Sequence, residues 1–127
     1  MAVNGIVVSV VASKSPEDVS IIKVSGYLDT TTARELETAL NGLLAKGSYK
    51  VVLDLSGVTY ISSAGWGIFI GEIKDIRNHG GDLKLAAMVG DVFEVFQLLE
   101  FQSILEAYPT IDDARDAFAK SPSGRSS

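Results

Sequence analysis

The sequence predicts an α/β fold: a single domain with a mixed central sheet of about five strands and about four helices packed on it. Three observations favour this class. Short β-branched runs alternate with longer segments of helical periodicity. The first two runs have no helical segment between them, which indicates a hairpin-like start. The composition, with 46% hydrophobic and 21% charged residues, is that of a folded globular chain.

The chain begins with two β-branched runs, residues 5–12 and 19–27, which predict the first pair of strands. Residues 13–18 between them supply a turn. Asp29 or Thr30 can cap the helix that follows. The apolar residues that share one face of this helix are Ala33, Leu36, Ala39, Leu40, Leu43 and Leu44.

Gly47 ends the first helix, and residues 49–55 then predict a short strand that is buried on both faces, as in parallel sheets. Residues 56–63 predict a short loop, which ends in two adjacent serines. A second helix is expected over 64–78, with a glycine-rich stop after it. Residues 83–88 predict the next strand.

The remaining elements are a helix on the spacing of residues 92–99, a short strand over 104–107 and a final helix over 110–118 with Thr110 as its cap. We therefore expect one domain over residues 3–119. The Ser, Gly and Pro content of residues 120–127 predicts a disordered tail.

Charge and composition exclude several function classes. The net charge of −5, without a cluster of Lys or Arg, argues against a nucleic-acid-binding surface. The absence of cysteine excludes disulfides, a thiol nucleophile and Cys-bound metals. The apolar runs are too short for a membrane span and the N-terminus lacks a signal-peptide pattern, so we expect a cytoplasmic protein without direct membrane insertion.

The most informative segment is the serine pair Ser62 and Ser63 at the predicted start of the second helix. A serine in this place is an ordinary N-cap. The same place also favours an added phosphate, because the helix dipole and unpaired N–H groups attract anions. The two interpretations are compatible, since a phosphorylated cap hydroxyl gains about −1.5 to −2 charges at the end of the helix that favours them.

Catalytic interpretations of this segment do not hold. His79 is the only histidine, and helical rise places it roughly 20 Å from Ser63, too far to act as its base. Gly65 and Gly67 suggest a dinucleotide-binding fingerprint, but the third glycine of that motif is missing, because position 70 is Ile70. A better explanation for the two glycines is that small residues let the helix pack closely on its strand. The acidic residues follow no metal-ligand spacing. We expect no cofactor, no metal and no enzymatic activity.

Three sequence blocks together resemble the STAS domain of bacterial anti-sigma-factor antagonists. The blocks are residues 26–29, residues 52–67 and residues 80–85, in the order and at the spacing of that family. The resemblance covers about residues 3–119. It implies that Ser63 is the phosphorylated serine. Most such antagonists have an aspartate where this chain has Ser62, so Ser62 remains an alternative acceptor.

The resemblance also implies which residues contact the partner. They are Asp29, Ser62, Ser63, Ala64, Gly65 and Trp66. Trp66 stands where leucine is commoner. From the residues alone, Trp66 is either a core residue or, if partly exposed, an anchor of the interface.

The function implied by the resemblance is a protein-binding switch. The unphosphorylated antagonist binds an anti-sigma factor with a histidine-kinase-like serine kinase fold, and a sigma factor is released. Phosphorylation ends the complex, and a metal-dependent serine phosphatase restores it. Two alternatives stay open: a STAS scaffold subunit of a stressosome-like or lipid-transport complex, and a small nucleotide-binding protein. The sequence has no phosphate-binding loop that would favour the latter.

Overall fold

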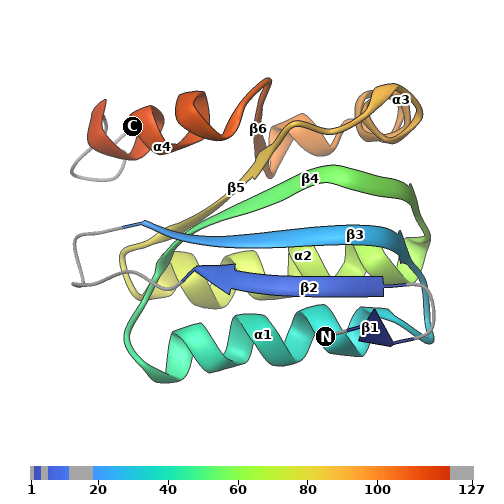
Figure 1. Cartoon of the computed structure of the whole chain (residues 1–127). Coiled ribbons are helices and arrows are strands. Elements are labelled where there is room, and N and C mark those ends of the chain that lie inside the picture. Colours follow the sequence, from blue (N-terminus) through green and yellow to red (C-terminus); the bar gives the residue numbers. More distant parts are fainter. Residues whose placement is uncertain (1, 4–5, 12–18, 121–127) are drawn as a thin grey trace.

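A computed structural model of the chain describes residues 2–3, 6–11 and 19–120. Its centre is a six-stranded mixed sheet in which the strands lie in sequence order (Figure 1). The strands are β1 (Ala2–Val3), β2 (Ile6–Val11), β3 (Ser20–Leu28), β4 (Lys50–Ile61), β5 (Asp82–Ala86) and β6 (Glu106–Tyr108). The first three pair antiparallel, and β3 to β6 pair parallel. The α/β class and the hairpin-like start are confirmed, with the two-residue β1 as an additional strand.

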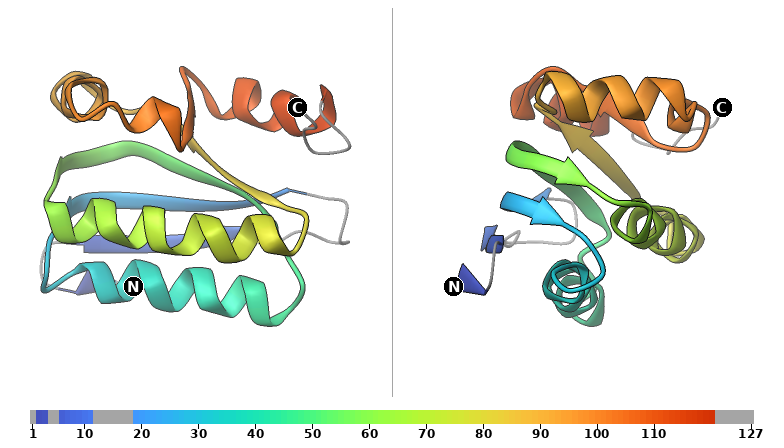
Figure 2. Two further views of the ribbon diagram at one scale, coloured as in Figure 1. Left: turned by 180° about the vertical axis from the view of Figure 1, so that it is seen from behind. Right: turned by 90° about the vertical axis from the view of Figure 1, so that its right-hand side faces the viewer.

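The helices are α1 (Ala33–Ala45), α2 (Ser63–Asn78), α3 (Gly90–Leu98) and α4 (Ile111–Lys120), with a short 3₁₀ turn η1 (Phe101–Ser103). Figures 1 and 2 show α1 and α2 together on one side of the sheet and α3 and α4 together on the other side. The main core lies under α1 and α2, and a smaller cluster of Val52, Ala86, Ala114 and Phe118 lies under α4. Within the described part of the chain, no helix is long and apolar enough to cross a membrane.

The strand predicted to be buried on both faces is confirmed. Every residue from Val51 to Leu55 is buried. Because side chains alternate along a strand, Val51, Leu53 and Leu55 enter the main core while Val52 enters the cluster under α4. The same strand thus joins both layers of helices.

Most of the loop predicted for residues 56–63 is wrong, because β4 continues to Ile61 and α2 begins at Ser63. The backbone keeps pairing with β3 through two register shifts, so the polar residues of this stretch do not end the strand. Gly57 permits the close pairing: a Cβ there would lie 2.4 Å from Ser25 Oγ. The bulged, extended β4 carries the chain directly to the start of α2.

Other predicted boundaries differ by a few residues. The N-cap of α1 is Thr32, not Asp29 or Thr30, because a tight turn comes before the helix. Strand β5 ends at Ala86, since Ala87 has a φ of 60°. Strand β6 begins at Glu106 because the N–H groups of Ile104 and Leu105 still bond the Phe101 carbonyl, in the turn that ends η1.

Thr110 caps α4 as predicted: its Oγ accepts a hydrogen bond of 3.0 Å from the Asp113 N–H. Helix α4 includes Lys120, so the predicted tail of 120–127 begins one residue early. Residues 121–127 and the predicted turn of 13–18 lie outside the described residues.

A buried ion-pair cluster lies between β5 and α4. The Lys84 side chain is 5% exposed, and its Nζ lies 3.0 Å from Asp82 Oδ2 and donates to Glu106 Oε1. The ring of Phe118, on α4, covers this ammonium at 4.7 Å from the ring centroid. The positive charge of the buried lysine is compensated by the two carboxylates and by the aromatic ring above it.

Candidate functional site

The two serines at the start of α2 have different environments. Ser62 is the N-cap, with an extended backbone (φ −80°, ψ 174°), and its Oγ accepts a hydrogen bond of 3.3 Å from the Gly65 N–H. Its own N–H donates to the Leu28 carbonyl at 2.8 Å. Ser63 is the first helical residue and is exposed. Among the described residues its hydroxyl has no hydrogen-bond partner, so of the two serines Ser63 is the one with a free hydroxyl in solvent.

The helix end beside Ser63 favours negative charge. The first intrahelical bond is donated by the Trp66 N–H to the Ser62 carbonyl, so the N–H groups of Ser63 and Ala64 precede the ladder. The first turn of α2 contains no acidic side chain. A phosphate on Ser63 would therefore meet donor groups and the positive end of the dipole without a carboxylate from the same turn.

Gly65 holds this helix end close to the sheet. A Cβ on Gly65 would lie 2.8 Å from Ile61 Cγ2 and 3.0 Å from Leu28 Cβ, closer than packed carbon atoms come. Gly67, in contrast, has open space around the position of a Cβ. The expected close packing is thus confirmed for Gly65 and wrong for Gly67.

Trp66 belongs to the core. It is 2% exposed and packs against Phe69 of α2, Phe96 of α3 and Phe101 of η1, with ring centroids 5.5, 6.0 and 5.0 Å away. Its Nε1 is buried, and no described residue accepts a hydrogen bond from it. A direct contact of this side chain with a partner is not compatible with such burial, so the core interpretation holds. Trp66 instead links the first turn of α2 to α3.

Asp29 lies at the same edge of the sheet as the serines. Leu28 and Ile61 are paired across the parallel strands β3 and β4, so Asp29 and Ser62 leave the sheet from neighbouring positions. The Asp29 Oδ1 accepts hydrogen bonds from Thr31 Oγ1 (2.7 Å) and from the Thr31 N–H (2.8 Å). The Thr31 hydroxyl is the main cause that lowers the pKa of the Asp29 carboxyl, which keeps it ionised.

The predicted contact residues therefore form one patch with graded exposure. Ser63 is exposed, Asp29, Ser62 and Ala64 are half-buried, and Gly65 and Trp66 are buried. The first four can meet another protein, while the last two position the turn that carries them.

His79 cannot act on Ser63, as predicted, because the two residues lie at opposite ends of α2. The His79 ring stacks on Tyr49 with the centroids 4.4 Å apart, a contact that the sequence did not predict. Its Nδ1 lies 2.9 Å from the Asp75 carbonyl oxygen. This histidine closes the end of α2 and is not part of a nucleophilic pair.

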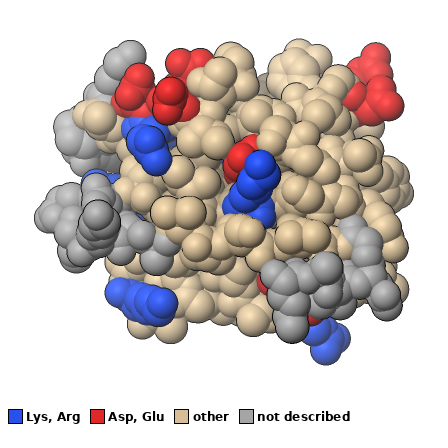
Figure 3. Space-filling model, in the orientation of Figure 1, with Lys and Arg blue, Asp and Glu red and all other residues tan. Residues whose placement is uncertain are grey.

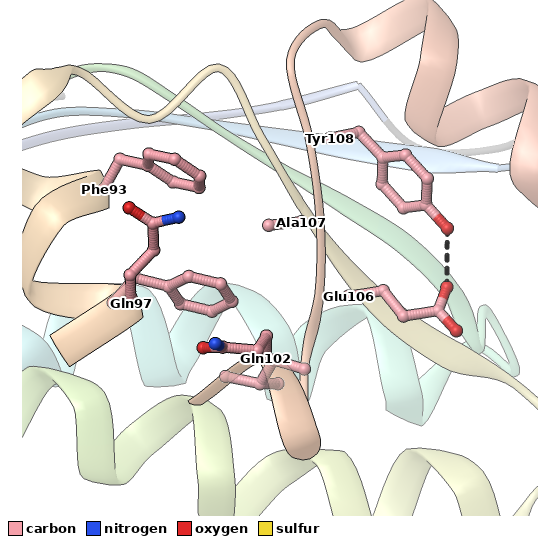
Figure 4. A pocket seen from close by; sticks show the side chains of 8 residues that line it. Phe93, Gln97, Gln102, Glu106, Ala107 and Tyr108 are labelled. Atoms are coloured by element: carbon pink, nitrogen blue, oxygen red, sulfur yellow. Dashed lines mark hydrogen bonds between the residues drawn. The ribbon is translucent and has the colours of Figure 1, made fainter. Parts of the chain in front are cut away.

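A hollow of about 310 Å³ lies between α3, η1 and β6 (Figure 4). Phe93 and Gln97 of α3 line one side, and Glu106 and Tyr108 of β6 line the other. The Glu106 carboxylate already accepts hydrogen bonds from Tyr108 Oη (2.7 Å) and from Lys84. Across the described ranges, no group of three or more His, Asp or Glu side chains could hold a metal ion.

Comparison with known proteins agrees with this geometry. Residues 11–114 match the family described as the STAS domain. The Bordetella bronchiseptica protein BtrV is 35% identical over 95 residues, which cover 75% of this chain and 82% of BtrV. The anti-sigma-B factor antagonist of Listeria monocytogenes is 31% identical over 85 residues, 67% of this chain and 75% of that one. The crystal structure of an anti-sigma factor antagonist from Mycobacterium paratuberculosis, 28% identical, has a TM-score of 0.79 over 91% of this chain and 96% of its own. The chain belongs to the STAS-domain family.

Proposed function

We propose that this chain is an anti-sigma-factor antagonist, a binding module whose complex is ended by phosphorylation of Ser63. The observation that carries the proposal is the division of roles between the two serines. Ser63 is exposed with a free hydroxyl at a helix end that favours a phosphate, whereas the Ser62 hydroxyl caps the helix. The named relatives from Listeria and Mycobacterium support the class of partner.

In this function the unphosphorylated protein binds an anti-sigma factor with a histidine-kinase-like serine kinase fold, in the cytoplasm, and a sigma factor is released. The antagonist is not an enzyme; the partner supplies the kinase activity. A metal-dependent serine phosphatase removes the phosphate. The patch of Asp29, Ser62, Ser63 and Ala64 is the contact surface that we assign to the partner.

The charge of a phosphate is sufficient to end such a complex. A dianion about 5 Å from a partner carboxylate, at an effective dielectric constant near 20, raises the energy by several kcal/mol. A loss of even ~3 kcal/mol lowers affinity more than a hundredfold. Within the antagonist itself the same charge meets a favourable helix end, so the fold tolerates it.

Ser62, in place of the aspartate common in this family, keeps the cap without adding a charge. Serine and aspartate are about equally good N-caps. We therefore infer that Ser62 positions Ser63 and does not accept the phosphate, since this residue is half-buried and its Oγ already accepts a hydrogen bond.

The test is phosphorylation by the cognate anti-sigma factor with ATP, followed by mass spectrometry of the intact protein and its peptides. We expect one phosphate on the unmodified chain, one on Ser62→Ala and none on Ser63→Ala. The two serine variants are matched controls, because each removes one hydroxyl of the pair. A phosphate that persists in Ser63→Ala and disappears in Ser62→Ala would overturn the assignment, and no phosphate on the unmodified chain would overturn the switch itself.

A binding measurement completes the test. Isothermal titration with the same anti-sigma factor should give a complex with the unmodified chain and at least a tenfold weaker one with Ser63→Asp. Aspartate carries less charge than phosphate, so the phosphorylated protein itself is the stronger comparison. Equal affinity for the phosphorylated and unphosphorylated proteins would contradict the proposed mechanism.

A further inference from the structure

The outer surface of α3 is apolar and unusually exposed. Leu98 and Leu99 are 75% and 55% exposed, and Val95 is 38% exposed. The inner surface of the same helix is ordinary core, since Val92 and Phe96 are buried. The helical spacing that predicted this helix rests on residues 92, 95, 96 and 99, yet only Val92 and Phe96 are buried. The others remain in solvent.

Carboxylates alternate with these apolar side chains. Asp91 and Val95 are four residues apart, as are Glu94 and Leu98, so all four lie on neighbouring turns of one side of the helix. We call the surface formed by Asp91, Glu94, Val95, Leu98 and Leu99 the α3 face. In the described residues, the carboxylates of Asp91 and Glu94 form no ion pair.

The surroundings of the α3 face have no compensating positive charge in sequence. From Leu85 to Ala114 the chain contains no Lys, Arg or His. The acidic residues of the same stretch are Asp91, Glu94, Glu100, Glu106, Asp112 and Asp113. Figure 3 shows acidic side chains along the upper rim of the molecule, over α3 and α4 in the orientation of Figure 1. The partner that fits this surface must therefore bring both apolar area and positive charge.

We propose that the α3 face is a docking surface for an amphipathic helix of a protein partner, with an apolar stripe flanked by Lys and Arg. The apolar stripe covers Val95, Leu98 and Leu99, while the basic side chains pair with Asp91 and Glu94. Helices that dock on a helical surface commonly do so through apolar anchors at this spacing. Charge complementarity around the anchors selects the partner and speeds association.

The same charges disfavour other occupants. A twofold dimer through the α3 face would bring the Asp91 and Glu94 carboxylates of both copies into one interface, where they would be removed from water without a positive partner on this face. An anionic membrane surface would repel them as well. A basic protein segment is the occupant that gains from both the apolar and the acidic parts of the face.

The α3 face is joined to the Ser63 end of α2 by the core. Phe96, on the inner side of α3, packs on Trp66, three residues after Ser63. A partner on the α3 face thus binds the same rigid unit, but through residues that carry no phosphate. The proposal stands whether or not Ser63 is phosphorylated, and it adds a second surface to the proposed function.

The experiment uses the ¹⁵N-labelled full chain and a synthetic amphipathic helix of Leu and Lys as the probe, with the same peptide carrying Glu in place of Lys as control. We expect chemical-shift changes centred on residues 90–99 with the Lys peptide and at least tenfold weaker binding of the Glu peptide. Binding should weaken with added salt, because part of it is charge pairing. Shift changes centred elsewhere, or equal binding of both peptides, would overturn the proposal.

Protein variants separate this face from general acidity. The double variant Asp91→Asn/Glu94→Gln keeps the side-chain shapes and should lower the affinity for the Lys peptide three- to tenfold. The double variant Leu98→Ser/Leu99→Ser should lower this affinity at least tenfold. Asp112→Asn/Asp116→Asn removes the same charge from α4 and should leave affinity within twofold. Equal losses in the α3 and α4 charge variants would refute a specific face. The proposal would also be overturned if the protein self-associates with rising concentration and Leu98→Ser/Leu99→Ser abolishes this self-association. The occupant of the α3 face would then be a second copy of the chain.

Discussion

Replacing Gly65 by alanine tests whether the first turn of α2 must pack directly on the ends of β3 and β4. The new Cβ would lie 2.8 Å from Ile61 Cγ2, 3.0 Å from Leu28 Cβ and 3.2 Å from the Leu28 carbonyl oxygen. Carbon atoms in contact prefer ~3.5–4.0 Å, so the helix end must move outward by roughly 0.5–1 Å. Such overpacking costs about 1–3 kcal/mol, and the better helix propensity of alanine offsets about 1 kcal/mol of it. We expect a net loss of up to about 2 kcal/mol in the free energy of unfolding, and a stability about 1–3 kcal/mol below that of a variant that gains the helix propensity without the overpacking.

The matched control is Gly67→Ala, two residues further along the same helix. A Cβ there meets open space, so only the propensity gain of about 1 kcal/mol remains, and this variant should be more stable than the unmodified chain. Urea unfolding followed by circular dichroism, with equal m-values, gives the two free energies. Because Ser63 moves with the displaced turn, Gly65→Ala should also be phosphorylated more slowly. If Gly65→Ala proves as stable as Gly67→Ala, the close contact that we derive for this turn is wrong.

Three further substitutions test other parts of the fold. Ser62→Ala should lower the free energy of unfolding by about 1 kcal/mol through loss of the cap, whereas Ser62→Asp should keep it; equal stability of the two would contradict the capping role. Lys84→Ala should lower the free energy of unfolding by about 3 kcal/mol, because two carboxylates lose their shared partner. An unchanged midpoint in urea unfolding would contradict this value. Burial, together with nearby carboxylates, raises the pKa of Glu72 above its ordinary value of 4.5. The folded state therefore favours the protonated acid, and the protein loses stability as the pH rises from 4.5 through the raised pKa. Glu72→Gln should therefore be about 0.3 kcal/mol more stable at neutral pH, with the gain vanishing in acid; a gain independent of pH would rule out this cause.

Sequence periodicity predicted the elements well where one pattern dominated. Leu36, Leu40 and Leu43 recur at the helical repeat and are the residues through which α1 packs on the core. The apolar run from Val51 to Leu55 contributes side chains to both core clusters. The pattern failed where polar residues lie inside regular structure. Strand β4 runs through residues 56–61 because backbone pairing with β3 continues, and pairing is not encoded in hydropathy.

The site was predictable in position but not in its division of roles. The order of strand, serine pair and apolar helix located Ser62 and Ser63 at a helix start. Which hydroxyl caps the helix depends on one residue's ψ, which composition does not determine. The burial of Trp66 follows from α3 and η1, whose aromatic residues are distant in sequence. The burial of Lys84 likewise depends on Glu106 and on α4, which only the tertiary fold brings together.

The position of Trp66 gives the protein a built-in optical probe. It is the only tryptophan in the chain, so excitation at wavelengths that the four tyrosines do not absorb gives emission from one indole. That indole is 2% exposed. It belongs to the turn of α2 that follows Ser63, and it contacts aromatic side chains of α3 and η1. Its emission wavelength, quenching and anisotropy can therefore follow, without any label, how modification of Ser63 and docking on α3 change the packing between these elements.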